Sequence, residues 1–177
     1  VLAPRLAART GAASAVGLLL AAAAMAWLSR LDADSSYWPL LVGLIPLGAG
    51  MGLAMTPATS AITTSLARAQ QGVGSAMNDL ARELGGALGI AVLGSVMQSV
   101  YRAHLALHGV PAGVAGQARA SAALALHLGP SVADSARVAF LDGFRSALLV
   151  AAGVMLVVAL GVLCRRAAGA AQAHRSS

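Results

Sequence analysis

Residues 143–164 read GFRSALLVAAGVMLVVALGVLC, a run of 22 residues in which almost every side chain is apolar. A helix needs about 20 predominantly apolar residues to cross the roughly 30 Å hydrocarbon core of a bilayer. Four stretches of the chain, including this run, meet or approach that requirement. They lie near residues 11–29, 38–60, 80–101 and 143–164. Because an open sheet edge cannot satisfy its hydrogen bonds in lipid, the predicted fold is an all-α membrane protein with about four transmembrane helices.

The composition of the whole chain agrees with a lipid environment. The chain has 177 residues, of which 58% are hydrophobic and only 10% charged, and its mean hydropathy is +0.78. A soluble domain usually carries about 25% charged residues, which are needed to cover a surface that faces water. The twelve basic residues are all arginines scattered between apolar runs. This pattern is typical of loops that flank membrane spans, so the bilayer is an expected partner and nucleic acid is not.

The arginines also predict an orientation. Most of those that flank the predicted spans fall on one side of the membrane: Arg5, Arg9, Arg68, Arg82, Arg165, Arg166 and Arg175. Positive loops are cytoplasmic, so both termini are predicted to be cytoplasmic and residues 102–141 to form a long outer loop. Trp and Tyr favour the membrane–water interface, and all six aromatic residues fall at the outer ends of the spans: Trp27, Tyr37, Trp38, Tyr101, Phe140 and Phe144.

The outer loop contains helical signals but no catalytic or metal-binding motif. Ser131 followed by Asp134 resembles a capping box, which predicts a helix running into the last span, and a second helix is expected near 112–128. His104 and His108 are spaced like two metal ligands, but no third ligand is evident, so solvated loop histidines are expected. The single cysteine, Cys164, excludes an intrachain disulfide. No motif supports enzyme activity, and no cofactor is expected.

The second span is rich in glycine. Gly48 and Gly52 lie four residues apart and share one helix face, where missing side chains let another helix approach closely. Pro57 removes a backbone donor from the same helix. Close packing is the simpler interpretation, and a hinge or a flexible helix that faces a substrate is the alternative.

The third span carries charged residues at its inner end. At 100° per residue, Asp79 and Glu83 share a stripe with Gly86 and Gly94, and a neighbouring stripe contains Asn78, Arg82, Gly85 and Gly89. Asn78 and Asp79 are each spaced to meet Arg82. The cluster is either an interfacial anchor or a cytoplasmic gate whose contacts change between transport states. A proton-carrying role is disfavoured because a carboxylate paired with Arg stays ionised.

Three segments together resemble a known family. They are GAGMGLAMTP at 48–57, GVGSAMN at 72–78 and RELGGALGIAVLG at 82–94. Their order and separation are similar to those of the drug:proton antiporters with fourteen transmembrane segments in the major facilitator superfamily. RLAARTG at 5–11 resembles a degenerate form of that family's cytoplasmic loop motif.

The resemblance implies that the four spans are the last four of fourteen in the C-terminal part of a transporter. It implies proton-driven efflux of lipophilic or cationic drugs, with the N-terminal remainder, a small-molecule substrate and protons as partners. The family's Gly-rich antiporter motif is absent here, so only structural and gating roles are carried over, to Asn78, Arg82, Gly85, Gly86, Gly89, Gly48, Gly52 and Pro57. The alternative is a small four-helix membrane scaffold or accessory subunit that does not transport. The start at Val1 suggests a fragment.

Overall fold

The fold is entirely helical over the residues that the structure, a computed structural model, describes. These are 3–32, 35–65 and 71–175, with side chains described for 11–32, 35–55, 71–165, 167 and 168. The helices are α1 (Ala3–Leu28), α2 (Tyr37–Ser65), α3 (Gln71–His104), α4 (Ala112–Ala120), α5 (Ala122–Ala125) and α6 (Pro130–Arg175). No strand occurs in the described ranges, which confirms the predicted fold class.

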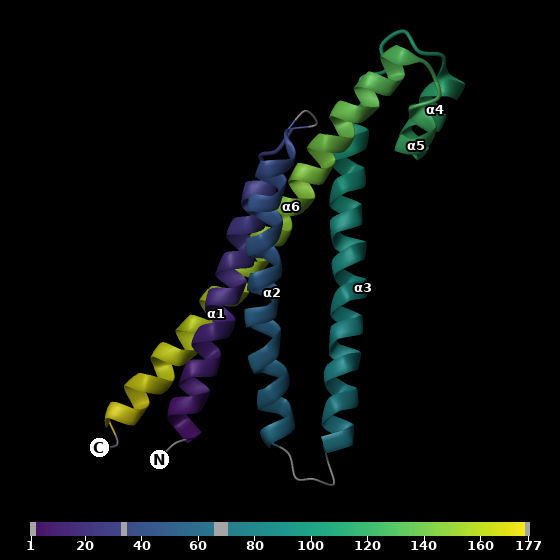
Figure 1. The fold of residues 1–177 in the computed structure, drawn as a ribbon. Coiled ribbons are helices and arrows are strands. Elements are labelled where there is room, and N and C mark those ends of the chain that lie inside the picture. The colour runs from purple at the N-terminus through teal and green to yellow at the C-terminus, as the bar shows by residue number, and fades with distance from the viewer. Residues whose placement is uncertain (1–2, 33–34, 66–70, 176–177) are drawn as a thin grey trace.

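The four long helices run lengthwise and alternate in direction (Figure 1). Both chain ends, the end of α2 and the start of α3 lie at one end of the bundle, called here the termini end. The short helices α4 and α5 lie at the opposite end, called the α4 end. Helix α1 packs against α2 and α6, and α6 packs against α3, whereas α2 and α3 touch only slightly. The α6 helix therefore connects the α1–α2 pair to α3.

Each long helix contains a segment long and apolar enough to cross a bilayer: Gly11–Leu28, Tyr37–Met55, Gln71–His104 and Pro130–Arg165. Two segments without charge, 84–101 and 146–164, correspond to about 27–28 Å of helix, which matches the hydrocarbon thickness. The helices themselves reach beyond the predicted spans, most clearly in α3 with 34 residues and α6 with 46. Helix continues past the apolar segment because nothing in the flanking sequence stops it.

The start of α6 differs in detail from the expected capping box. The helix begins at Pro130, so Ser131 lies inside the first turn instead of capping it. Pro is well suited to the first helical position, where its missing N–H has no partner to lose. Gly129 precedes it with φ +115°, a backbone conformation that only glycine adopts readily. The carbonyl of Gly129 accepts the N–H of Ala133 at 2.9 Å.

Glycines set the closest approach between helices. A Cβ atom added to Gly17 of α1 would lie 2.5 Å from the carbonyl oxygen of Gly50 in α2, and one added to Gly50 would lie 2.6 Å from the carbonyl oxygen of Gly17. Ser14 Oγ donates to the carbonyl of Ala54 at 3.4 Å along the same seam. Gly143 of α6 has the same role against Met97 of α3. In lipid, where packing rather than water exclusion drives helix association, such contacts hold helices together.

The largest fully buried side chain among the described residues lies at the α4 end. Tyr101 of α3 is 1% exposed, and its hydroxyl donates to the carbonyl of Ala118 in α4 at 2.7 Å. Around it pack Leu105, Ala125, Val132 and further alanines. The predicted outer loop is therefore a folded cap on the bundle, built from α4, α5 and the first turns of α6.

The close contact between Gly17 and Gly50 predicts that a glycine-to-alanine change has different effects on stability at two positions. Gly50→Ala should lower the free energy of unfolding in detergent by about 1–3 kcal/mol, because the new methyl group meets backbone. Gly153→Ala in α6 meets nothing within 4 Å, so it should be neutral or stabilising by up to about 1 kcal/mol. Denaturant titration followed by circular dichroism measures both, and equal effects would contradict the seam.

Candidate functional site

The charged cluster predicted on the third span lies along an open hollow at the termini end. Asp79, Arg82 and Glu83 of α3 line this hollow together with Met55 of α2, and its volume is about 520 Å³. It is called here the α2–α3 hollow. All three charged residues are exposed, and the neighbouring Asn78 is half-buried. The cluster therefore faces α2 across a space that these helices leave unfilled.

The expected ion pairs do not form in this arrangement. Among the described residues, no ion pair joins Arg82 to Asp79 or Glu83, although the spacing permits one. Helical proximity alone therefore does not bring the charges together. A gate needs contacts that can differ between states, and the observed arrangement leaves room for such a change.

The level of the cluster follows from the length of α3. From Glu83 the uncharged segment 84–101 leads to Arg102, a distance of about 28 Å along the helix. Arg102 and Glu83 then mark the two edges of the hydrocarbon layer. At the edge, a charge costs less than the roughly 2.5–3.5 kcal/mol that insertion scales assign to the bilayer centre.

The charged end of α3 and the glycines that follow it line two different spaces, because Arg82 lines the hollow with Asp79 and Glu83 although it was predicted on the stripe of Gly85 and Gly89. Gly85 and Gly89 line a groove of about 370 Å³ between α3 and α6, called the α3–α6 groove. Its other walls are apolar: Leu88, Val92, Leu93, Val150, Ala151, Val154 and Met155. Asp79 and Glu83 instead face the α2–α3 hollow. A Cβ added to Gly86 or Gly94 would meet nothing within 4 Å.

The glycines of α2 that approach α1 most closely are not the ones singled out in the sequence. A Cβ added to Gly48 or Gly52 would meet nothing within 4 Å, whereas Gly43 and Gly50 face α1 closely. Pro57 lies within α2, but its side chain is outside those described. A packing role for Gly48 and Gly52 therefore remains a prediction, and it requires a surface beyond these helices.

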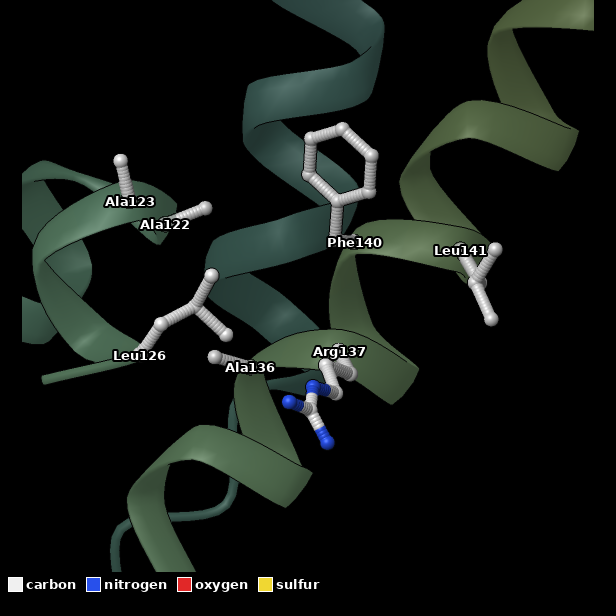
Figure 2. Close-up of a pocket in the computed structure, with 7 residues that line it drawn as sticks. All are labelled: Ala122, Ala123, Leu126, Ala136, Arg137, Phe140 and Leu141. Carbon is white, nitrogen blue, oxygen red and sulfur yellow. The ribbon is translucent and has the colours of Figure 1, made fainter. Parts of the chain in front are cut away.

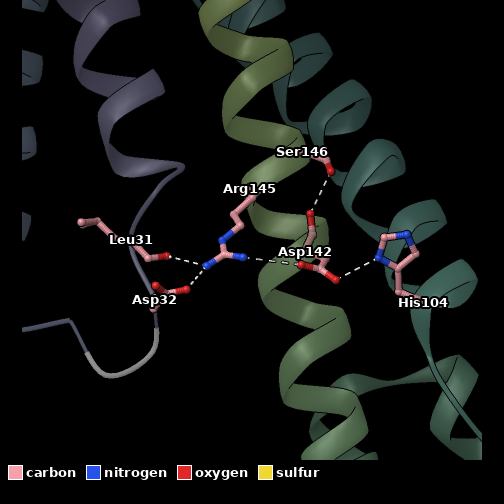
Figure 3. Close-up of polar contacts among 6 residues, drawn as sticks. All are labelled: Leu31, Asp32, His104, Asp142, Arg145 and Ser146. Atoms are coloured by element: carbon pink, nitrogen blue, oxygen red, sulfur yellow. Dashed lines mark hydrogen bonds and ion pairs between the residues drawn. The ribbon is translucent and has the colours of Figure 1, made fainter.

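A second polar cluster lies at the α4 end, and sequence reasoning missed it (Figure 3). We call Asp32, His104, Asp142 and Arg145 the Arg145 network. Arg145 pairs with Asp32 and also donates to the carbonyl of Leu31 at 3.2 Å. Its other terminal nitrogen lies 3.7 Å from Asp142 Oδ1, and Asp142 Oδ2 lies 2.9 Å from His104 Nδ1. One arginine and one carboxylate thus tie the α1–α2 connection and the end of α3 to α6.

A local signal for this network exists in the sequence. Arg145 is a charge at the start of an apolar run, and Asp142 is placed three residues before it, so the two can pair on one helix face. The partners Asp32 and His104 are far away in the chain, and no local pattern indicates them. His104 was expected to be a solvated loop residue, but it ends α3 and pairs with Asp142 while its side chain stays 53% exposed. Within the described residues, no group of three potential metal ligands lies together.

The chain is similar to part of several resistance transporters. Puromycin resistance protein pur8 of Streptomyces alboniger is 42% identical over 53% of this chain and 20% of that protein. Multidrug efflux pump LfrA of Mycolicibacterium smegmatis is 30% identical over 72% of this chain and 27% of that protein. Methyl viologen resistance protein SmvA of Salmonella typhimurium is 30% identical over 82% of this chain and 31% of that protein. The chain thus spans less than a third of these curated relatives. No family model and no solved structure matches it.

The Arg145 network predicts unequal effects of its members on stability. Arg145→Ala should lower the free energy of unfolding by about 1–3 kcal/mol, because it removes charge-assisted hydrogen bonds to Asp32 and to a carbonyl and an ion pair with Asp142. Arg145→Lys should restore less than half of the loss, since a single ammonium group cannot span these partners as a guanidinium does.

Asp32→Ala is the matched control, because the Asp32 side chain is 75% exposed and its pair should be worth less than about 1 kcal/mol. Thermal unfolding in detergent, followed by circular dichroism, measures all three variants. If Asp32→Ala and Arg145→Ala had equal effects, the contacts of Arg145 with Asp142 and with the Leu31 carbonyl would contribute nothing.

Proposed function

Since the chain is homologous to a segment of the drug-resistance efflux pumps of the major facilitator superfamily, we propose that it forms the C-terminal part of a drug:proton antiporter. The carrying observation is the α2–α3 hollow, where three charged side chains of one helix end line a space large enough for a small molecule. The relatives are transporters and not enzymes, and the chain is a multi-pass membrane protein.

The proposed mechanism is alternating access, in which two helical bundles rock around a site near the bilayer midplane. This chain supplies four helices of one bundle, and only 6% of the apolar segment of α3 is buried within the chain. The face of α3 that carries Gly86 and Gly94 is then covered by helices from the N-terminal remainder. Small residues on that face permit the close contact that helices make in lipid.

The charged lining of the α2–α3 hollow would bias the two transport states. When the hollow narrows, Arg82 comes within reach of carboxylates, and the resulting pairs favour the closed state. A substrate or proton shifts that equilibrium only by binding the two states differently. Asp79 and Glu83 supply negative charge at the entrance, which attracts cationic substrates. One relative is a methyl viologen resistance protein, and methyl viologen is a dication.

The gating role of Arg82 is tested in a full-length transporter that contains this chain. Arg82→Ala should reduce proton-driven efflux of a cationic dye by about tenfold, the effect expected for losing one charge-assisted contact in a single state. Arg165→Ala is the control. Arg165 is an exposed arginine of α6 at the termini end, and it does not line the hollow. Its loss should change efflux by no more than about twofold. If the Arg82→Ala variant, expressed at the same level, exported the dye at the wild-type rate, the gating role of Arg82 would be contradicted.

The proposed topology has both termini in the cytoplasm and α4 and α5 on the outer side. It is supported by the placement of both chain ends at one end of the bundle (Figure 1) and by the flanking arginines. A cysteine introduced at Ser177 should be protected from an impermeant maleimide in intact cells, whereas one introduced at Ala123 of the outer cap should be labelled. Labelling of the cysteine at position 177 in intact cells would show that the C-terminus faces the outside, opposite to the proposed topology.

A further inference from the structure

A pocket at the α4 end has no part in the proposed site. It lies between α5 and α6 and has a volume of about 400 Å³ (Figure 2). Its lining residues are Ala122, Ala123, Leu126, Ala136, Arg137, Phe140 and Leu141. We call it the α5–α6 pocket. Figure 2 shows Leu126 extending toward Ala136 of α6, the Arg137 guanidinium group beside Ala136, and Leu141 on the far side of α6.

Large apolar side chains are exposed in and around this pocket. Leu126 and Phe140 line it and are 45% and 41% exposed, and Leu124 of α5 is 52% exposed. Large apolar side chains exposed at an apolar pocket indicate contact with a membrane or a partner. The cap therefore presents a surface that is not suited to bulk water.

The position of the pocket along α6 indicates the bilayer boundary. Residues 146–164 are uncharged and Arg165 follows them, so Arg145 lies about one hydrocarbon thickness from Arg165. Phe140 and Phe144 lie just beyond, where aromatic rings favour the interface. Arg137 lies about two turns of helix from Arg145, at the level of the lipid headgroups. The pocket therefore lies in the interfacial layer, just outside the hydrocarbon.

The charge on Arg137 is available to an anionic ligand. Among the residues that the structure describes, its one ion pair is with Asp134 at 3.6 Å, and the two side chains are 70% and 75% exposed. Such an exposed pair contributes little and is readily exchanged. A guanidinium group offers two parallel donors, which match a phosphate group well. An apolar pocket with one guanidinium at its rim suits a ligand that joins an apolar chain to a phosphate.

From this combination we propose that the α5–α6 pocket binds a phospholipid of the surrounding bilayer. An acyl chain occupies the space between Leu126 and Phe140, and the headgroup phosphate accepts hydrogen bonds from Arg137. The bound lipid covers the exposed apolar side chains and joins the cap to the membrane surface. This binding does not depend on transport and can be measured on the chain itself.

The test uses the 177-residue chain in nanodiscs of phosphatidylglycerol that contain a trace of the same lipid with a photoreactive acyl chain. Cross-links located by mass spectrometry should concentrate on α5 and residues 136–141. Arg137→Ala should lower the yield there about tenfold, the loss expected for one charge-assisted contact. Ala123→Phe, which fills the pocket from an exposed position, should lower it to a similar degree.

Two controls separate a phospholipid site from general lipid contact. Arg119→Ala removes another exposed arginine of the cap that does not line the pocket, and it should leave the yield unchanged. A photoreactive diacylglycerol, which has acyl chains but no phosphate, should give at least tenfold fewer cross-links there than the photoreactive phosphatidylglycerol at the same mole fraction. Equal yields for Arg137→Ala and Arg119→Ala, equal yields from the two photoreactive lipids, or full yield in Ala123→Phe would each overturn the proposal. Circular dichroism verifies that the variants retain their helix content.

Discussion

Hydrocarbon offers no hydrogen bonds and solvates no charges, and this constraint shapes the whole structure. Each span must satisfy its backbone internally, so the long segments are helices. Charges must leave the apolar layer, so Glu83 and Arg102 lie at opposite edges on α3, and Arg145 and Arg165 do so on α6. The uncharged segments between these charges have nearly equal lengths, and each is about as long as the hydrocarbon core of a bilayer is thick. On these two helices, charged side chains therefore lie outside the apolar layer.

The two ends differ in how tightly they are closed. At the α4 end, the Arg145 network and the buried Tyr101 tie α3 and the α1–α2 connection to α6 and the cap. At the termini end, α2 and α3 scarcely meet, and their charged and apolar side chains line an open hollow. Between the ends, glycine contacts such as Gly17 against Gly50 hold the helices together. The charged groups at the α4 end are thus held in contact with one another, whereas those at the termini end line an open space.

Local patterns predicted the elements well and their contacts poorly. Hydropathy located four long helices, and Pro130 with its flanking residues indicated a helix running into the last span. The small-residue pattern selected Gly48 and Gly52, but the seam with α1 uses Gly43 and Gly50, which lie elsewhere around the same helix. A spacing of four residues indicates that two side chains share a face, but it does not indicate which face another helix meets. His104 was misjudged for the same reason, because its partner Asp142 is 38 residues away.

The sequence by itself determined that lipid surrounds the long apolar segments, how many long helices there are and that charges lie at their ends. These properties depend on composition and on distances along one helix. It also carried the family resemblance, which rests on short segments. The tertiary structure alone decided which glycines touch, that Arg82 faces α2 across a hollow, and that Arg145 joins segments more than one hundred residues apart. These contacts depend on how each helix is rotated and crossed against its neighbours, and that geometry comes from packing of the whole chain, which no local pattern encodes.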